Sequence, residues 1–388
     1  MGFWKVWRRS VVKNGNGCDV DNGKMKTLRL RVDPVRMEDC ESRASIDEAA
    51  TILRRGGTVA LPTETVYGLG ANALELAAVE KIFAAKGRPG WDPLIVHVVD
   101  EVMLAGLVLE IPEAARRLMA KFWPGPLTLL LPRSAAVPDR VTAGRPLVGV
   151  RMPEHPVALE VIRRAGVPVA APSANRFGYT SPTTADHVLD DLDGRIDAVV
   201  DAGPTAFGLE STVLDPNASP MVIYRPGAIT LEQIRDAAGQ AELYSEPGEL
   251  VSDPRESMPS PGVGLRHYAP RARLMLVETG EGQEGKDLSS RLYLKAVDFS
   301  RERVGVMLPD GLPGEHSTVE SRDRLAFAEI FPWGRWSDPE ELAQRLFSGL
   351  RALDAAGCTV ILCPVPPVHG IGVAIRDRLR KAAKGERA

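Results

Sequence analysis

The sequence predicts an α/β protein in which a twisted mixed sheet is covered by helices and is followed by a smaller, doubly wound α/β domain. Strand and helix patterns alternate along most of the chain, and its strands are apolar on both faces. The composition then changes over residues 240–264, which are rich in Glu, Pro, Ser and Gly. A chain of 388 residues with 44% hydrophobic content is long enough for two domains with separate cores.

The alternation begins with a helix predicted over residues 46–55. Ser45 is its expected N-cap with Glu48 in capping-box spacing, and Gly56 and Gly57 are expected to end it. Strands are predicted at residues 58–62, 94–99, 127–131, 147–151, 167–171, 198–201, 211–215 and 221–224, and further helices at 74–85, 112–122, 156–165, 184–192 and 231–238. Because strands that are apolar on both faces need helices on both sides, the sheet should be covered. The last two strands follow one another directly, so the sheet should be mixed.

The second domain is predicted to follow a linker of about 25 residues, which is longer than compact domains usually tolerate. Beyond it, residues 273–277, 303–308 and 359–364 are strand-like, and residues 339–356 and 371–382 are helix-like. We therefore predict a larger α/β domain over residues 40–239, a linker over 240–265 and a small Rossmann-like domain over 266–388. Residues 1–28 lack the apolar core of a secretory signal and are predicted to be a disordered extension.

Charge and cysteine content narrow the class of protein. The net charge of −3 argues against a surface dominated by nucleic-acid binding. The four cysteines, at positions 18, 40, 358 and 363, are scattered and suggest neither a disulfide framework nor a zinc site. No apolar run reaches the roughly 18 residues of a membrane span. We expect a protein of a reducing, cytoplasmic compartment with no membrane contact.

Two short polar segments next to apolar strands are candidates for ligand binding. In the segment Lys86-Gly87-Arg88, side chains two residues apart would point the same way if the loop were extended. Ser173 and Asn175 have the same spacing after the strand predicted at residues 167–171. Cations on one wall and neutral hydrogen-bonding groups on the other would suit a phosphorylated ligand.

Common catalytic motifs are absent from the sequence. It contains no GxxxxGK[ST], no GxGxxG that opens a helix after a strand, no HExxH and no GxSxG. The histidines show no metal-ligand spacing, so no protein metal site is predicted. His97 closes the strand LIVH near the Lys86 loop, although a histidine at a strand end is more often a core residue than a ligand.

The motifs taken together resemble the YrdC-like family of threonylcarbamoyl-AMP synthases in its two-domain long form. The matching strings are PTETVYGLG, KGRP, DPLIVHV, WPGPLTLLL, VGVRMPEHP, APSANRFG with SPT, ESTVLD, YRPG and, after the linker, SPGVGLRHYAP. The resemblance implies that L-threonine, bicarbonate and ATP, with magnesium accompanying ATP, give threonylcarbamoyl-adenylate and pyrophosphate. A separate tRNA threonylcarbamoyl transferase complex would use the product, and a weak tRNA contact is a further expectation.

The resemblance also implies roles for individual residues. The catalytic signature falls on Lys86, Arg88, Ser173 and Asn175. The residues that would hold L-threonine are Thr65, His97, Arg151, Ala171 and Ser211. Those that would contact ATP are Arg88, Asp92, Leu147, Ser173, Ser181, Arg225 and Tyr268. Asp92 stands where the family usually has Asn, and its negative charge would lie near the triphosphate.

Other interpretations of these residues remain open at this stage. Lys86 and Arg88 could be a solvated helix C-terminus, and Ser173 and Asn175 could be turn formers after a strand. The chain could be an RNA-binding module of the same fold, for which salt-dependent tRNA affinity without ATP turnover would be diagnostic. A relative that uses carbamoyl phosphate is a third class, but it occurs in larger chains with additional segments. We also consider a linker that closes over the ATP site.

Overall fold

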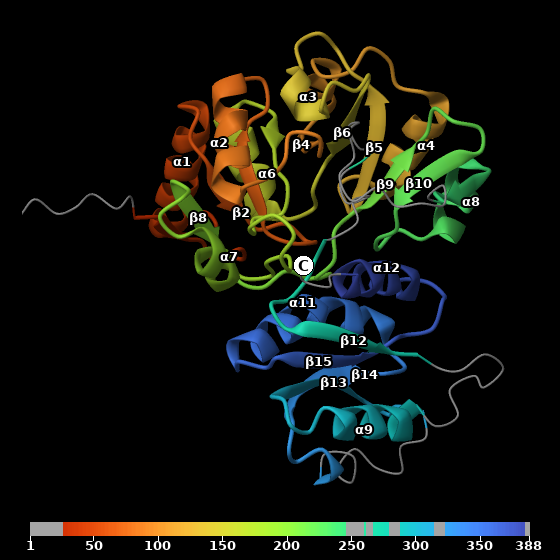
Figure 1. The fold of residues 1–388 in the computed structure, drawn as a ribbon. Helices are drawn as coiled ribbons and strands as arrows, with labels where there is room; N and C mark the ends of the chain where they lie inside the picture. The colour runs from red at the N-terminus through yellow and green to blue at the C-terminus, as the bar shows by residue number, and fades with distance from the viewer. Residues whose placement is uncertain (1–25, 246–259, 261–266, 279–287, 314–322, 385–388) are drawn as a thin grey trace, which may run out of the picture.

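The computed structural model describes residues 26–245, 260, 267–278, 288–313 and 323–384. Its described part contains a large mixed sheet with helices on its two faces and a smaller parallel sheet below it (Figure 1). The predicted fold class is therefore confirmed.

The larger sheet has eleven strands among the described residues. β2 runs antiparallel to β3 but parallel to β8, so the sheet is mixed as predicted. In order across the sheet the strands are β1 (Leu28–Arg31), β8 (Ala198–Asp201), β2 (Val59–Leu61), β3 (Gly68–Asn72), β7 (Val169–Ala170), β4 (Ile95–His97), β6 (Leu147–Arg151), β5 (Leu127–Pro132), β9 (Thr212–Asp215), β10 (Met221–Arg225) and β11 (Ala241–Leu243).

Helices cover both faces of this sheet because its strands are apolar on both sides. The helices are α1 (Cys40–Arg54), α2 (Leu76–Lys86), α3 (Glu101–Ala105), α4 (Glu113–Phe122), α5 (Asp139–Thr142), α6 (Pro156–Ala165), α7 (Ala185–Leu192) and α8 (Leu231–Ala238). Along β2, Val59 packs with α1 and α6 in one hydrophobic cluster, whereas Ala60 packs with α2, α4 and α7 in another. Because successive side chains of a strand point to opposite faces, neighbouring residues of β2 belong to two different hydrophobic cores.

The smaller sheet is parallel throughout. Its strand order is β12 (Arg273–Val277), β15 (Val360–Pro364), β13 (Val304–Asp310) and β14 (Glu329–Arg335). In β15, Ile361 and Cys363 pack toward α11 (Pro339–Ala355) and α12 (Gly372–Ala383), while Val360 and Leu362 pack toward α9 (Leu288–Asp298). A parallel sheet covered on both faces is the arrangement expected of a doubly wound domain.

The first predicted helix begins six residues earlier than expected, at Cys40 instead of Ile46. Its N-cap is Asp39, whose side chain accepts a hydrogen bond from the Ser42 amide at 2.7 Å, so Ser45 lies inside the helix. The predicted capping box is therefore wrong. The apolar periodicity begins only at Ile46, because the first turn packs little apolar surface, and that misled the prediction.

Strand β3 was missed because its sequence, GLGAN, has little β propensity. The small residues are required by packing. A Cβ added to Gly70 would lie 2.7 Å from the Val169 side chain and 3.2 Å from the Val59 carbonyl oxygen. Close approach of neighbouring strands, and not propensity, therefore selects glycine here. Helix α9 and strand β14 of the second domain were also missed.

The ends of the larger sheet lie outside the residue range predicted for the first domain. β1 pairs in parallel with β8, so residues from Leu28 onward belong to the sheet, although residue 28 was predicted to end a disordered extension. β11 pairs in parallel with β10, so Ala241–Leu243 of the predicted linker are also sheet. Of the rest of the predicted linker, only Gln240, Tyr244, Ser245 and Ser260 are described, and residues 1–25 also lie outside the described residues. The prediction that the linker closes over a site is therefore untested.

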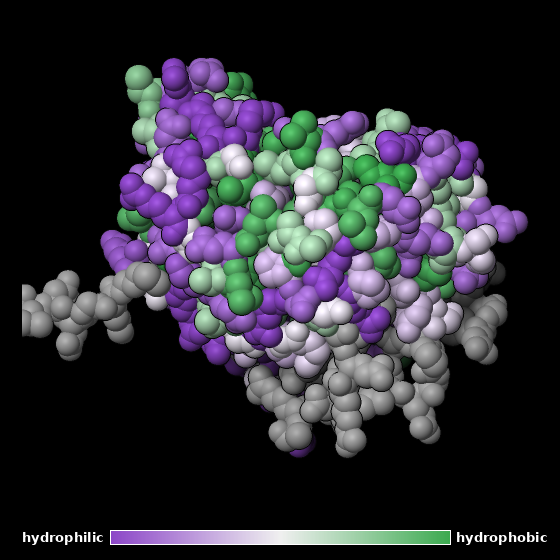
Figure 2. All heavy atoms as spheres, turned by 90° about the horizontal axis from the view of Figure 1, so that it is seen from above, coloured by the Kyte–Doolittle hydropathy of each residue, from purple (hydrophilic) through white to green (hydrophobic). Residues whose placement is uncertain are grey.

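The upper face of the large domain carries hydrophobic residues in separate clusters among hydrophilic ones (Figure 2). Val102 of α3 is 84% exposed and Leu109, which follows α3, is 74% exposed. Single exposed apolar side chains of this kind are normal on a protein surface. Within the described ranges no helix is both long and apolar enough to cross a bilayer.

Candidate active site

A polar cavity of about 50 Å³ opens where several strands of the large sheet end. It is lined by the β2–β3 connection, by β4 and its approach, by the end of β6, and by the segments that follow β7 and precede β9. The C-terminal part of the chain also contributes. The lining residues are Thr63, Thr65, Val66, Gly68, Arg88, Pro93, Ile95, His97, Arg151, Ala171, Pro172, Ser173, Glu210, Ser211, Arg225, His267 and Tyr268.

Arg151 ends β6 and extends into this cavity with a side chain that is almost fully buried. Its Nη1 donates to the Thr65 hydroxyl at 2.9 Å and its Nε to the Gly125 carbonyl at 3.1 Å. Its Nη2 forms an ion pair with the buried carboxylate of Glu64. The guanidinium is thus held in one orientation before any ligand binds, which is what bidentate recognition of a carboxylate requires.

His97 pairs with Arg151 in the parallel β4–β6 ladder and lies at the same end of the sheet. Burial, and then the neighbouring Arg151 charge, lower the pKa of His97 to about 3. The imidazole is therefore neutral at physiological pH and can accept or donate a single hydrogen bond. Its Nδ1 is buried with no hydrogen-bond partner in the described structure, which leaves that atom available to a ligand.

Arg88 lies in the loop that follows α2, and it is paired with Asp92. Its Nη2 is 2.9 Å from Asp92 Oδ2 and donates to the Pro93 carbonyl at 2.8 Å. Burial by itself would raise the pKa of Asp92, but Arg88 and then His267 outweigh it and hold that pKa below its usual value. The Asp92 carboxylate is therefore charged and neutralises Arg88.

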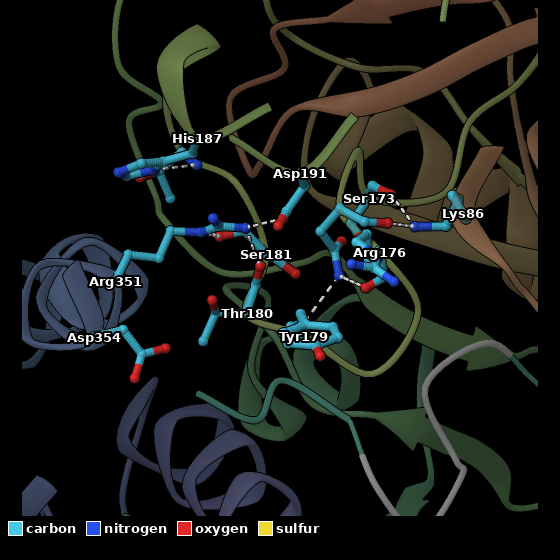
Figure 3. Close-up of polar contacts among 12 residues, drawn as sticks. Lys86, Ser173, Arg176, Tyr179, Thr180, Ser181, His187, Asp191, Arg351 and Asp354 are labelled. Carbon is cyan, nitrogen blue, oxygen red and sulfur yellow. Dashed lines mark hydrogen bonds and ion pairs between the residues drawn. The ribbon is translucent and has the colours of Figure 1, made fainter. Parts of the chain in front are cut away.

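The extended-loop prediction required Lys86 and Arg88 to share a wall of the cavity, but they do not. Lys86 is the last residue of α2, and Gly87 follows in the left-handed conformation with φ of 62°, so the two side chains diverge. The Lys86 Nζ donates to the carbonyl oxygens of Ser173 and Asn175, both at 2.5 Å (Figure 3). Lys86 holds the loop that carries Ser173.

Asn175 is also turned away from the cavity, contrary to the prediction that it projects together with Ser173. Its Nδ2 donates to the carbonyl oxygens of Arg176 at 2.7 Å and Tyr179 at 2.8 Å. These bonds close the loop on itself, which corresponds to the turn-forming role weighed from the sequence. Ser173 itself lines the cavity.

Arg225 and Ser211 form a further wall, at the ends of β10 and the start of β9. Arg225 Nη2 donates to Ser211 Oγ and its Nε to the Ser211 carbonyl, both at 3.0 Å. Ser211 Oγ is also 2.8 Å from the hydroxyl of Thr128 on β5. Burial is the main cause that lowers the pKa of Arg225, which nevertheless stays a cation at neutral pH.

The structure brings together nine of the residues predicted from the sequence and leaves five outside the lining. Those that line the cavity are Thr65, Arg88, His97, Arg151, Ala171, Ser173, Ser211, Arg225 and Tyr268. Lys86, Asp92, Leu147, Ser181 and Asn175 are not among the lining residues. Lys86, Asp92 and Asn175 instead bond to cavity-lining residues or to their loop, and Leu147 is the first residue of β6.

Three ionisable residues of the site were missed, as was Thr63, which also lines the cavity. Glu210 and His267 line the cavity, and Glu64 holds Arg151 from behind. All three stand inside motifs that were noticed in the sequence, ESTVLD, HYAP and PTETVYGLG. The signal that could have found them is a carboxylate or histidine next in sequence to a recognised contact residue.

His267 and Tyr268 fill part of the cavity from the C-terminal side. The Tyr268 ring stacks on Phe347 of α11, with centroids 5.7 Å apart. Sites for ligands of drug size typically measure about 300 to 1,000 Å³, several times the space that remains. Tyr268 has φ of 67°, a left-handed conformation that a residue other than glycine adopts only at a cost.

The described residues contain no group of three or more His, Cys, Asp or Glu side chains that could hold a metal ion. The single carboxylate that lines the cavity, Glu210, has one oxygen bonded to Ser181 and the other to Arg378.

Two family models match the chain one after the other, and the second begins before α8 and β11 of the large domain. Residues 51–227 match the family model described as "Telomere recombination". Residues 229–384 match the model described as "Threonylcarbamoyl-AMP synthase, C-terminal domain".

Full-length relatives and a solved structure carry the same likeness. The threonylcarbamoyl-AMP synthase of Bacillus subtilis (strain 168) is 44% identical over 93% of this chain and 99% of its own length, and that of Pyrococcus abyssi is 41% identical over 86% and 93%. The crystal structure of P. abyssi Sua5 complexed with L-threonine superposes with a TM-score of 0.80 at 39% identity, over 92% of this chain and 98% of that chain. By this likeness over nearly its whole length, the chain belongs to the threonylcarbamoyl-AMP synthase family.

Proposed function

We propose that this chain makes L-threonylcarbamoyladenylate from L-threonine, bicarbonate and ATP, with release of pyrophosphate. The observation that carries the proposal is the cavity in which Arg88, Arg151 and Arg225 converge with the hydroxyls of Ser173 and Ser211. Three buried guanidinium groups in one small space match a reaction that joins a carboxylate-bearing substrate to a triphosphate. The names of the relatives favour this synthase over the RNA-binding module considered from the sequence.

The proposed chemistry needs no nucleophile from the protein. The threonine amine attacks the carbon of bicarbonate with loss of water, or the carbon of carbon dioxide formed from it with loss of a proton, and gives a carbamate. A carbamate oxygen then attacks the α-phosphorus of ATP, the bond to the bridging oxygen breaks, and pyrophosphate leaves. The protein holds the reactants in line and stabilises the charge that develops, and positioning of this kind can supply about 7 to 11 kcal/mol.

Arg151 is proposed to hold the threonine carboxylate. Its Nη1 and Nε are already directed by Thr65 and Gly125, and Glu64 neutralises it from the far side. His97, neutral because of its low pKa, is proposed to bond a polar group of the amino acid. The Ala171 backbone and the Ser211 hydroxyl complete the predicted threonine contacts.

Arg88 and Arg225 are proposed to bind the phosphates of ATP, with Ser173 as a neutral partner. Arg88 enters the cavity from the loop after α2 and Arg225 from the end of β10, so they can contact different oxygens of a triphosphate. Both are arginines, whose charge persists despite burial. The predicted ATP contacts of Asp92, Leu147 and Ser181 would require a larger opening than the present cavity, because those residues do not line it.

Magnesium is proposed to arrive with ATP as part of the substrate. Mg²⁺ usually takes one or two carboxylates together with phosphate oxygens and water. Both oxygens of Glu210 are engaged with protein groups, so the phosphates would supply most of the ligands.

ATP binding is proposed to displace His267 and Tyr268, because the space beside them is too small for a nucleotide. Such a movement would relieve the strained backbone of Tyr268 and would separate His267 from Asp92, whose Oδ2 lies 3.8 Å from its Nε2. The downstream tRNA threonylcarbamoyl transferase complex, a weak tRNA contact and a cytoplasmic location remain parts of the proposal.

The test is incubation of the full chain with ATP and labelled bicarbonate, with L-threonine, L-serine or L-valine as the amino acid. We expect pyrophosphate release and a labelled adenylate with L-threonine and much less with the other two, because each lacks one feature of the threonine side chain. Arg88→Ala should abolish the release while the chain stays folded. Release that does not depend on threonine, or that survives in Arg88→Ala, would refute the proposal.

A further inference from the structure

Glu210 is the one carboxylate that lines the cavity among the described residues, and its side chain is only 8% exposed. It directly precedes Ser211 and shares the cavity with Arg88 and Arg225. An uncompensated negative charge at this place would repel the phosphates of a nucleotide, because charges interact strongly where water is excluded. A site of this kind needs a dedicated partner for Glu210.

The C-terminal domain supplies that partner through α12. Arg378 is fully buried, and its Nε lies 2.7 Å from Glu210 Oε2. Its Nη1 lies 2.6 Å from Asp377, and its guanidinium carbon lies 5.1 Å from the centre of the Tyr268 ring. A residue 168 positions away in sequence thus contacts two groups that line the cavity.

The second oxygen of Glu210 connects to the loop that carries Ser173. Glu210 Oε1 accepts a short hydrogen bond from the Ser181 hydroxyl. A second arginine of the C-terminal domain, Arg351 of α11, also contacts this loop. It donates to the carbonyls of Thr180 at 2.6 Å and Ser181 at 3.4 Å, and pairs with Asp191 at 2.6 Å (Figure 3).

Two helices of the C-terminal domain therefore hold Ser181. α11 contacts its backbone carbonyl directly, and α12 acts on its hydroxyl through Glu210. Burial alone would raise the pKa of Glu210, but the guanidinium groups of Arg378 and then Arg225 outweigh it and keep that pKa below its usual value. Glu210 is consequently ionised, and its charge is balanced only while Arg378 is in place or Arg225 is drawn toward it.

We propose that Arg378 is a positioning residue for the nucleotide site, which acts by neutralising Glu210 and holding it against Ser181 so that the cavity accepts a polyphosphate. This inference rests on the proposed function. It gives the C-terminal domain a specific part in nucleotide binding: without α12, Glu210 would face the phosphates as a free anion and would compete for Arg225.

The test compares ATP affinity of full-length variants by titration calorimetry, with the KM for ATP and kcat of pyrophosphate release measured beside it. The variants are Arg378→Met, Glu210→Gln, the double variant, and Arg380→Met as control. Arg380 lies on the same helix, its side chain is 55% exposed, and it pairs with Glu278 instead of the cavity. Thermal melting reports whether each variant is folded.

We expect Arg378→Met to weaken ATP binding about tenfold or more, with kcat changed less, since one unpaired charge near the phosphates has effects of this order. Adding Glu210→Gln should restore ATP binding to Arg378→Met, so that the double variant binds ATP as tightly as Glu210→Gln alone does. Arg380→Met should bind ATP like the wild type. If Arg378 only holds the domains together, the neutral amide cannot compensate, and the double variant would stay as weak as Arg378→Met.

Each remaining outcome also counts for or against the role of Arg378. Unchanged ATP affinity in Arg378→Met overturns the inference. If Arg378→Met does not fold, the comparison of the double variant with Glu210→Gln replaces it, and weaker binding by the double variant overturns the inference. If the wild type does not bind ATP, the proposed function itself is refuted. If the wild type binds ATP and Arg378→Met binds it equally well, only the role of Arg378 is refuted.

Discussion

Replacing Lys86 by methionine tests whether this residue acts as an anchor for the Ser173 loop. Its Nζ is the hydrogen-bond donor to the carbonyl oxygens of half-buried Ser173 and buried Asn175, each at 2.5 Å. Burial, and then the charge of Arg88, lower the pKa of Lys86 well below its ordinary value. Both the ammonium and the neutral amine carry the two N–H groups that these bonds need.

Methionine fills a similar volume but cannot donate, so Lys86→Met leaves both carbonyls without their partner. A buried polar group left unsatisfied costs about 1 to 3 kcal/mol, and two would cost about 2 to 6 kcal/mol. Relief of the unfavourable burial of the amine offsets part of this. We therefore expect a loss of about 2 to 4 kcal/mol in the free energy of unfolding, a large share of the usual 5 to 15 kcal/mol.

Urea denaturation of the full chain measures this loss. The matched control is Lys81→Met on the same helix, because the Lys81 Nζ donates at 2.7 Å to the carbonyl of Gly56, and neither residue lines the cavity. The control should lose no more than about 1 kcal/mol. Pyrophosphate release should fall in Lys86→Met through displacement of Ser173. Equal stability losses in the two variants would refute the anchoring role.

Three further predictions follow from single residues. Arg151→Lys should raise the KM for L-threonine about tenfold or more, since lysine keeps the charge but loses the fork that bonds Thr65 at 2.9 Å; steady-state kinetics measures it. His187 has its pKa lowered to about 4, chiefly by burial, so the unfolded chain binds more protons below about pH 6.5 and stability is lost as pH falls toward 4. His187→Gln should reduce the difference in unfolding free energy between pH 7 and pH 4.5 by about 1 to 2 kcal/mol in urea titrations. Gly70→Ala should lower the melting temperature, at a cost of about 1 to 3 kcal/mol, because the new Cβ would lie 2.7 Å from the Val169 side chain.

The fold could be predicted from the sequence where elements are apolar and periodic. β12 was predicted with both ends correct, and α11 ends one residue before its predicted end. The failures involve residues whose role depends on distant partners. β3 has small residues because β7 approaches closely, and β11 is a short strand that exists only because β10 offers it an edge. Neither cause is local.

The site was predicted less completely, since the side-chain directions of Lys86 and Arg88 depend on where α2 ends. The predicted end was Ala85, which would leave Lys86 in an extended loop. The helix in fact includes Lys86, and the left-handed Gly87 turns the chain before Arg88. A shift of one residue therefore moved one cation from the cavity wall to the loop behind it. Sequence spacing does not encode this difference, because lysine and alanine are both strong helix formers.

The cations of the site also have partners that a search for cations overlooks. Arg88 pairs with Asp92, Arg151 with Glu64, and Glu210 with Arg378. A buried guanidinium without a counter-charge would be costly, so each must be balanced while no ligand is present. An anionic substrate then joins a neutral, already oriented pair and does not have to organise a mobile cation. Preorganisation of this kind explains why arginines of a cavity built for anions are paired with carboxylates such as Asp92 and Glu64, which do not line it, and why one of the balancing charges is supplied by a second domain.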